Sequence, residues 1–302
     1  MSKYMVKRVV LAIASIIIVT LITFFVMNLI PGGPFTAEKA PSQAVMDALT
    51  KRYNLDKPLG EQYLLYMRNL LHGDWGIDMK NGREIGPDLF SKFAVSAKLG
   101  GIAMIIAVVF GVILGSIAAL NRNKIPDRII IFFTTLGTAM PSFILATLLL
   151  LVFCVQLAIF PVFGSNPSLV LPVISLAVYP TAYITRLTKT SMLDALSQDY
   201  IRTARAKGVS RSKIIFVHAL KNGLIPVVTY LGPQIAYIIT GSMVVETIFT
   251  VPGLGTYFVK AITDRNYSVI MATTIFLAVL MIVANLITDI VYKLIDPRIT
   301  FE

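Results

Sequence analysis

Six long apolar runs restrict this chain to one kind of fold. They lie at about residues 9–30, 99–120, 129–160, 169–184, 224–249 and 269–292. About 20 apolar residues in a helix cross the hydrocarbon core of a bilayer, and a helix satisfies its own backbone hydrogen bonds there. With 56% hydrophobic residues, 14% charged residues and a mean hydropathy of +0.77, the composition lies outside the soluble range. We predict an all-α polytopic membrane protein with six transmembrane helices.

Basic residues predict how the chain is oriented. Sixteen of the 27 Lys and Arg residues fall in 1–8, 122–128, 186–221 and 293–298, whereas segment 31–98 has nine bases and eight acids. Short loops rich in Lys and Arg stay in the cytoplasm. We therefore expect a multi-pass membrane protein with both termini cytoplasmic and segment 31–98 outside. This topology accounts for most of the net charge of +11, so no nucleic-acid partner is predicted.

Three regions are predicted. Residues 1–95 hold the first transmembrane helix and an extracytoplasmic helical segment, residues 96–293 a five-helix core with a cytoplasmic loop at 186–226, and residues 294–302 a cytoplasmic tail. In the outer segment, Ser42 is suited to cap one helix and Pro58 to begin another. Trp75 lies in a Gly-flanked turn. The outer segment is interpreted either as a packed cap over the first helix or as a platform for an external partner.

A basic elbow at 199–213 interrupts the apolar chain. Gly208 is suited to end one short helix and Ser210 to cap the next, with Val209 and Ile214 at the two staple positions around that cap. A shaped basic element of this kind favours docking to a cytoplasmic partner, and an interfacial helix on anionic membrane lipid is the alternative. The predicted docking residues are Asp199, Tyr200, Arg202, Thr203, Ala204, Arg205, Ala206, Lys207, Gly208, Ser210 and Lys213.

The chain shows no machinery for driving transport or catalysis. No charge is evident at mid-depth of the runs, where an ion-coupled carrier needs one. None of the nineteen glycines is followed by Lys, as a phosphate-binding loop requires. Cys154 is the only cysteine, and His72 and His218 are expected on opposite sides of the membrane. We expect no metal, no cofactor and no enzymatic activity in this chain, with an ion-coupled carrier or channel as the alternative class.

Two places in the runs are candidates for a transport pathway. Pro141 lies inside the third run, where a proline kinks or breaks a helix. Such breaks are tolerated where they line a cavity or pack on protein, so Pro141, Ser142 and Phe143 are interpreted as pathway residues or as a simple packing kink. Glu246, near the outer end of the fifth run, is a further pathway or gating candidate.

The elbow resembles the coupling loop of permease subunits in binding-protein-dependent ABC importers. The general pattern of that family has an acid at the position of Arg202 and a proline at the position of Lys221, and both departures favour its peptide-transport branch. Further similarities to oligopeptide and dipeptide permeases follow in order along the chain, at Asn28–Gly32, Leu55–Leu59, Gln62–Tyr63, Gly73–Gly76, Met140–Phe143, Glu246–Phe249, Pro252–Gly255, Tyr292 and Asp296–Ile299.

The resemblance implies a type I ABC importer permease fold, and the long outer segment favours the first permease subunit of the oligopeptide system. It also implies the partners: a homologous second permease, two cytoplasmic ATPase subunits that bind ATP and Mg, and an extracytoplasmic peptide-binding protein. ATP-driven alternating access would then import oligopeptides. The same architecture importing dipeptides, nickel or a metal-chelate is the alternative.

Overall fold

The computed structural model describes residues 2–29, 56–161 and 168–295, and in this part of the chain all regular structure is helical. The predicted helix capped by Ser42 and most of the predicted tail lie outside these residues. The helices are α1 Ser2–Leu29, α3 Leu59–Leu71, α4 Ile85–Leu120, α5 Ile125–Ala139, α6 Ser142–Leu149, the π-helical segment Leu150–Gln156, α7 Val170–Ser197, α8 Asp199–Ala206, α9 Arg211–Lys213, the π-helical segment Ile214–Ala219, α10 Leu220–Gly223, α11 Ile225–Ile239, α12 Met243–Ile248, α13 Leu254–Thr263 and α14 Tyr267–Ile295.

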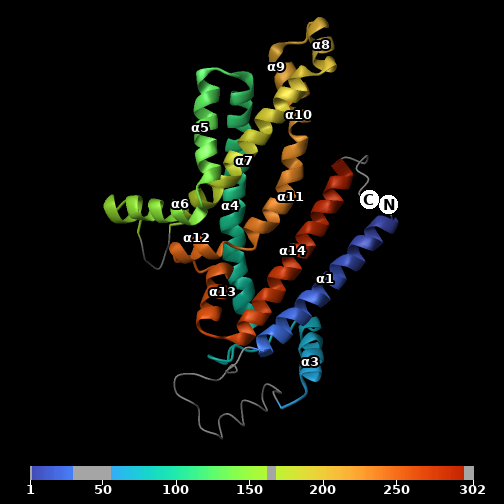
Figure 1. Cartoon of the computed structure of the whole chain (residues 1–302), viewed down its shortest axis with the longest axis vertical. Coiled ribbons are helices and arrows are strands. Elements are labelled where there is room, and N and C mark those ends of the chain that lie inside the picture. The colour runs from blue at the N-terminus through green and yellow to red at the C-terminus, as the bar shows by residue number, and fades with distance from the viewer. Residues whose placement is uncertain (1, 30–55, 162–167, 296–302) are drawn as a thin grey trace.

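The described residues contain five helices that are long and apolar enough to cross a membrane, or six spans when one bent pair of helices is counted as a span, and the latter number equals the predicted one. Five are Val6–Leu29, Ile85–Leu120, Val170–Ser197, Ile225–Ile248 and Tyr267–Thr288. The sixth is the pair of helices at 125–139 and 142–156, which meet at an angle of 103°. The third predicted run is therefore a broken segment, and α6 extends sideways from the foot of α5 (Figure 1).

The break lies where the sequence predicts it. Helix α5 ends at Ala139, and Met140 has the extended conformation that a residue before proline prefers. Pro141 then precedes the first residue of α6, where its missing N–H costs nothing.

Helices α4 and α7 form the centre of the molecule because small residues let their backbones approach. A Cβ atom on Gly111 would lie 2.7 Å from the Ile184 Cβ, and one on Gly115 would lie 2.6 Å from the Thr185 carbonyl oxygen. This spacing of two glycines four residues apart is common where membrane helices pack closely. The adjoining core joins α4, α7 and α11 through Met104, Ala107, Ile184, Val227 and Ile238.

Helix α7 is longer than the fourth apolar run. The run ends at residue 184, but the helix continues to Ser197 because Thr185, Thr188 and Met192 are fully buried against the rest of the protein. Residues 186–197, which were predicted as part of the cytoplasmic loop, are therefore helical and continuous with the membrane segment.

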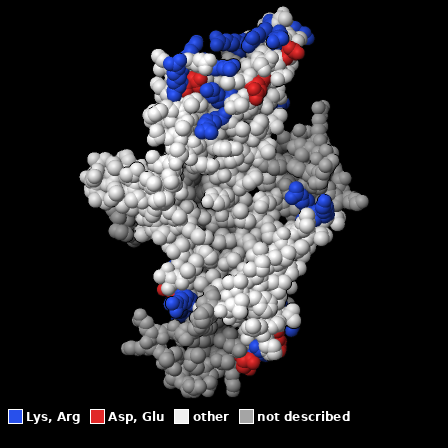
Figure 2. Space-filling view, viewed as in Figure 1, with Lys and Arg blue, Asp and Glu red and all other residues white. Residues whose placement is uncertain are grey.

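Charged side chains gather toward the two ends of the molecule in Figure 2, and a smaller basic group lies at mid-height on one side. Figure 2 shows Lys and Arg side chains gathered over the end formed by α8, α9 and the α4–α5 connection. We call this end the basic face. Helices α3, α12 and α13 lie toward the opposite end (Figure 1), so the long helices run between the two faces as membrane spans would.

The outer segment packs as a cap. On α3, Tyr63 lies with its ring 5.4 Å from that of Phe24 on α1, and its hydroxyl is 2.9 Å from the Thr20 hydroxyl. Trp75 lies in the predicted turn with its ring 5.6 Å from that of Phe276 on α14. These contacts agree with the interpretation of a cap over the first helix, which here extends to α14.

Candidate functional site

The elbow turns at the C-terminal end of α8, where local backbone hydrogen bonds fix the conformation of the chain. Gly208 has a φ of +72°, in the left-handed region that glycine tolerates best. Its N–H donates to the Arg205 carbonyl at 3.0 Å, and the Val209 N–H donates to the Ala204 carbonyl at 3.1 Å. These two bonds are those of a Schellman motif. They fix the direction in which the chain leaves α8, as the glycine at this position predicts.

A small apolar core holds the elbow to the end of α7. Ile201 and Ile214 are buried together, and Val209 packs against them, which confirms the staple. Ser210 lies immediately before α9, at the capping position, but its hydroxyl makes no capping hydrogen bond. The prediction of Ser210 as a side-chain cap is therefore wrong, since apolar packing rather than a hydroxyl fixes the turn. The buried members are Ala195, Ile201, Ala204, Ile214 and Ala219.

The outward side of the elbow is polar and largely basic. Ala204 is the one predicted docking residue that is buried, at 9% exposure, because it faces the apolar core of the elbow. Its assignment to the docking surface is therefore corrected: Ala204 supports the surface from beneath. We call the remaining exposed set the elbow surface, which consists of Asp199, Tyr200, Arg202, Thr203, Arg205, Ala206, Lys207, Gly208, Ser210 and Lys213.

The elbow surface is mechanically connected to the membrane helices. Only Gln198 separates the end of α7 from the start of α8, and α7 packs along α4 over much of its length. A force on α8 would therefore reach the centre of the membrane region through a continuous helix.

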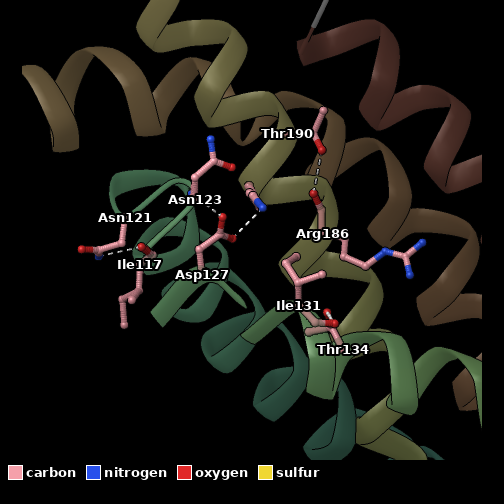
Figure 3. A network of polar contacts seen from close by, with 9 residues as sticks. Ile117, Asn121, Asn123, Asp127, Ile131, Thr134, Arg186 and Thr190 are labelled. Atoms are coloured by element: carbon pink, nitrogen blue, oxygen red, sulfur yellow. Dashed lines mark hydrogen bonds and ion pairs between the residues drawn. The ribbon is translucent and has the colours of Figure 1, made fainter. Parts of the chain in front are cut away.

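A buried ion pair ties α7 to α5 just below the basic face (Figure 3). Lys189 Nζ on α7 lies 2.5 Å from the Asp127 Oδ1, and the two side chains are 20% and 6% exposed. The Asp127 Oδ2 accepts the backbone N–H of Asn123 at 2.8 Å, where Asn123 has a φ of +65°. One carboxylate thus holds both the α4–α5 connection and α7. Sequence reasoning had counted Lys189 only as a loop charge.

The residues predicted to line a pathway lie at the start of α6 and on α12, two helices that pack against each other. Pro141, Ser142 and Phe143 are exposed at the break between α5 and α6. Glu246 is fully buried and presents no free carboxylate to a cavity; its role in the pathway or its gating stays a prediction.

The Glu246 carboxylate instead joins three elements. It accepts hydrogen bonds from the Ser96 hydroxyl on α4 at 2.7 Å and from the backbone N–H groups of Gly255 and Thr256 in the first turn of α13 at 2.8 and 3.2 Å. A Cβ on Gly253 would lie 2.5 Å from both the Glu246 Oε2 and the Ser96 Oγ. The glycines of the 252–255 motif therefore leave room for a carboxylate that fastens α12 and α13 to α4.

The opposite face carries a cavity of about 590 Å³ between the 76–85 turn, α4 and α13. The Asn266 amide donates to the Asp78 Oδ1 at 2.6 Å on its wall, and Lys80 pairs with Asp264 at 3.7 Å. Charges of both signs line it, and no group of three or more His, Cys, Asp or Glu that could hold a metal ion occurs within the described ranges.

Two family models match this chain. Residues 111–301 match the binding-protein-dependent transport system inner membrane component, and residues 1–89 match the N-terminal part of the membrane component of such systems. Among curated relatives, the chain is 46% identical to the dipeptide transport system permease protein of Bacillus subtilis, covering 99% of this chain and 98% of that one. It is 44% identical to the oligopeptide transport system permease protein of Haemophilus influenzae, with both chains fully covered.

A solved structure shares the fold. A crystal structure of an amino acid ABC transporter with histidines superposes with a TM-score of 0.54 at 17% identity, covering 70% of this chain and 94% of that one. The matched models and full-length relatives together decide the family. The chain belongs to the inner membrane components of binding-protein-dependent transport systems, as an ABC transporter permease.

Proposed function

We propose that this chain is the first permease subunit of an oligopeptide importer. Its relatives among oligopeptide permeases match from end to end, at 44% identity in Haemophilus influenzae and 41% in Escherichia coli. A homologous second permease completes the pathway, two cytoplasmic ATPase subunits bind ATP and Mg, and an extracytoplasmic binding protein delivers peptide. Import then proceeds by alternating access, with closure of the ATPase pair moving the elbow.

The observation that carries the proposal is the elbow surface itself. It is exposed, its shape is fixed by the end of α8, and it is nearly continuous with α7. A surface that transmits motion from a soluble subunit to the membrane helices needs these properties. On this proposal the basic face lies on the cytoplasmic side of the membrane, and both termini are cytoplasmic. The cavity on the opposite face is then available to the binding protein. The positive charge gathered over α8 and α9 (Figure 2) agrees with that orientation.

Two substitutions test the docking role in the complete importer. Arg205→Glu reverses one exposed charge of the elbow surface, and Gly208→Trp adds bulk where no atom lies within 4 Å of a Cβ. We expect both to lower peptide uptake and substrate-stimulated ATPase activity. The purified Arg205→Glu chain should keep its thermal stability, whereas Gly208→Trp should lose about 1–2 kcal/mol because Gly208 has a positive φ. Arg128→Glu, an exposed arginine of the basic face on α5, is the matched control and should retain both activities. Undiminished uptake and ATPase stimulation in both elbow variants would refute the docking role.

Dipeptides are a second candidate substrate, because the Bacillus subtilis relative at 46% identity is a dipeptide permease. Nickel or a metal-chelate is the alternative that the architecture alone allows. Competition of radiolabelled peptide uptake by unlabelled peptides of increasing length, and by nickel or a chelate, distinguishes the three. Competition that strengthens when the unlabelled peptide is longer than two residues, and that is absent with nickel, supports the oligopeptide assignment. Competition by nickel alone would refute that assignment.

A further inference from the structure

Arg186 lies deeper in the membrane region than its position in the sequence suggests. It stands one helical turn before Lys189 on α7, and sequence reasoning had placed it with the cytoplasmic bases. Lys189 reaches Asp127 near the basic face, whereas the Arg186 guanidinium points away from that pair (Figure 3). Its Nη1 donates instead to the Thr138 hydroxyl, at 3.2 Å.

The position of Thr138 on α5 gives the depth. Thr138 follows Asp127 by eleven residues of one continuous helix, which corresponds to about 16 Å along the axis at 1.5 Å per residue. Helix α5 runs nearly parallel to the long axis of the molecule (Figure 1). The hydrocarbon core is about 30 Å thick. With Asp127 taken as its cytoplasmic boundary, the guanidinium lies up to roughly halfway across, beside Thr138 and close to the break at Met140 and Pro141.

A permanently charged group at this depth needs a reason. Arg186 is exposed, and it forms no ion pair with any residue that the structure describes. Arginine stays protonated in proteins, and charged side chains inside membranes face a cavity or a partner rather than lipid. An arginine near the end of a span usually extends toward the interface, yet this one extends inward.

The residues around Arg186 form a polar and aromatic stripe. Tyr179, Tyr183, Arg186 and Thr190 follow one another at helical spacing on α7, and all four are exposed. The Tyr183 ring stacks on that of Tyr230 of α11, with the ring centres 4.4 Å apart. Hydroxyl-bearing rings beside a cation are unsuited to contact with lipid chains and well suited to a hydrated pathway.

We propose that Arg186 binds the carboxylate of the transported peptide, with Thr138 orienting the guanidinium and Tyr183 bordering the site. A guanidinium presents several N–H donors in a planar fork that matches a carboxylate. Every linear peptide with a free C-terminus carries that group whatever its sequence, so such a contact suits a transporter of varied peptides. The inference rests on the proposed peptide substrate and adds its position in the pathway.

The test compares one peptide with a free C-terminal carboxylate and the same peptide as its C-terminal amide. Both are presented on saturated binding protein to the complete importer in proteoliposomes with ATP, and the measured quantity is the ratio of the two uptake rates. Arg186→Gln should lower the acid-to-amide ratio about tenfold relative to the wild type, the effect of losing one charge-assisted hydrogen bond. Arg186→Lys, which keeps the charge without the fork, should give an intermediate ratio.

The controls separate this site from a structural role. Arg128→Gln removes an exposed charge of the basic face on α5 and should leave the ratio unchanged. If Arg186 instead pairs with an acid of the second permease, Arg186→Gln would lower uptake of both peptides equally, and an unchanged ratio would overturn the carboxylate site. A wild-type importer that takes up neither peptide would refute the proposed function itself.

Discussion

The ion pair between Lys189 and Asp127 offers the sharpest energetic test of the structure. Lys189→Met removes the cation but keeps most of the side-chain volume. It leaves the Asp127 carboxylate 6% exposed, with the Asn123 N–H as its hydrogen-bond donor. Breaking a buried pair by removing one partner costs about 3–5 kcal/mol, since a buried charge is left uncompensated. The Asn123 bond and the nearby bases of the basic face reduce this cost, so we expect a loss of about 3 kcal/mol.

The second variant of this double-mutant cycle removes the charge of the Asp127 carboxylate instead of leaving that charge unpaired. Asp127→Asn keeps an oxygen that accepts the Asn123 N–H, and the double variant Asp127→Asn/Lys189→Met replaces the pair with neutral groups of similar size. Because neutral replacement of a buried pair is often close to neutral in stability, we expect the double variant to recover to within about 1 kcal/mol of the wild type.

The assay is the free energy of unfolding from denaturant titration of the purified chain in detergent micelles. Lys124→Met, an exposed lysine in the same connection, serves as the control and should change stability by less than about 0.5 kcal/mol. A loss below about 1 kcal/mol for Lys189→Met, or a double variant whose loss equals the sum of the single losses, would show that the pair does not hold α5 to α7.

Two further substitutions test the packing of the spans and of the opposite face. Gly115→Ala should destabilise the protein by about 1–3 kcal/mol, because its Cβ would lie 2.6 Å from the Thr185 carbonyl oxygen. The control Gly101→Ala, where no atom lies within 4 Å of the Cβ, should be neutral or stabilising in the same titration. Equal effects of the two substitutions would contradict the close approach of α4 and α7. Glu246→Gln should cost about 2 kcal/mol or more through the weakened bonds to Ser96 and the α13 N-terminus. The control Glu61→Gln on exposed α3 should not change the thermal unfolding temperature. If Glu246→Gln does not lower that temperature either, Glu246 does not fasten α12 and α13 to α4.

The local features of the elbow could be predicted because each depends on a few consecutive residues. Gly208 ends α8 since glycine accepts a positive φ, and Pro141 marks the break between α5 and α6 since proline removes a backbone hydrogen bond and clashes with the preceding turn. Ser210 was mispredicted as a side-chain cap because the packing of Val209 and Ile214, rather than a hydroxyl, fixes the turn. The orientation of Ala204 toward the core could not be predicted either, as it depends on where α8 lies against the end of α7.

The sequence by itself determined the class of protein and the positions of its long apolar segments, because the bilayer imposes a length and a polarity that each apolar run must meet alone. Only the tertiary structure decided what the charged and polar groups within those spans do. Ser96 and Glu246 are 150 residues apart and share a hydrogen bond, and the Arg186 guanidinium extends inward to Thr138, 48 residues earlier. Such contacts depend on which helices lie side by side and on the direction of each side chain, and no local pattern of residues carries either one.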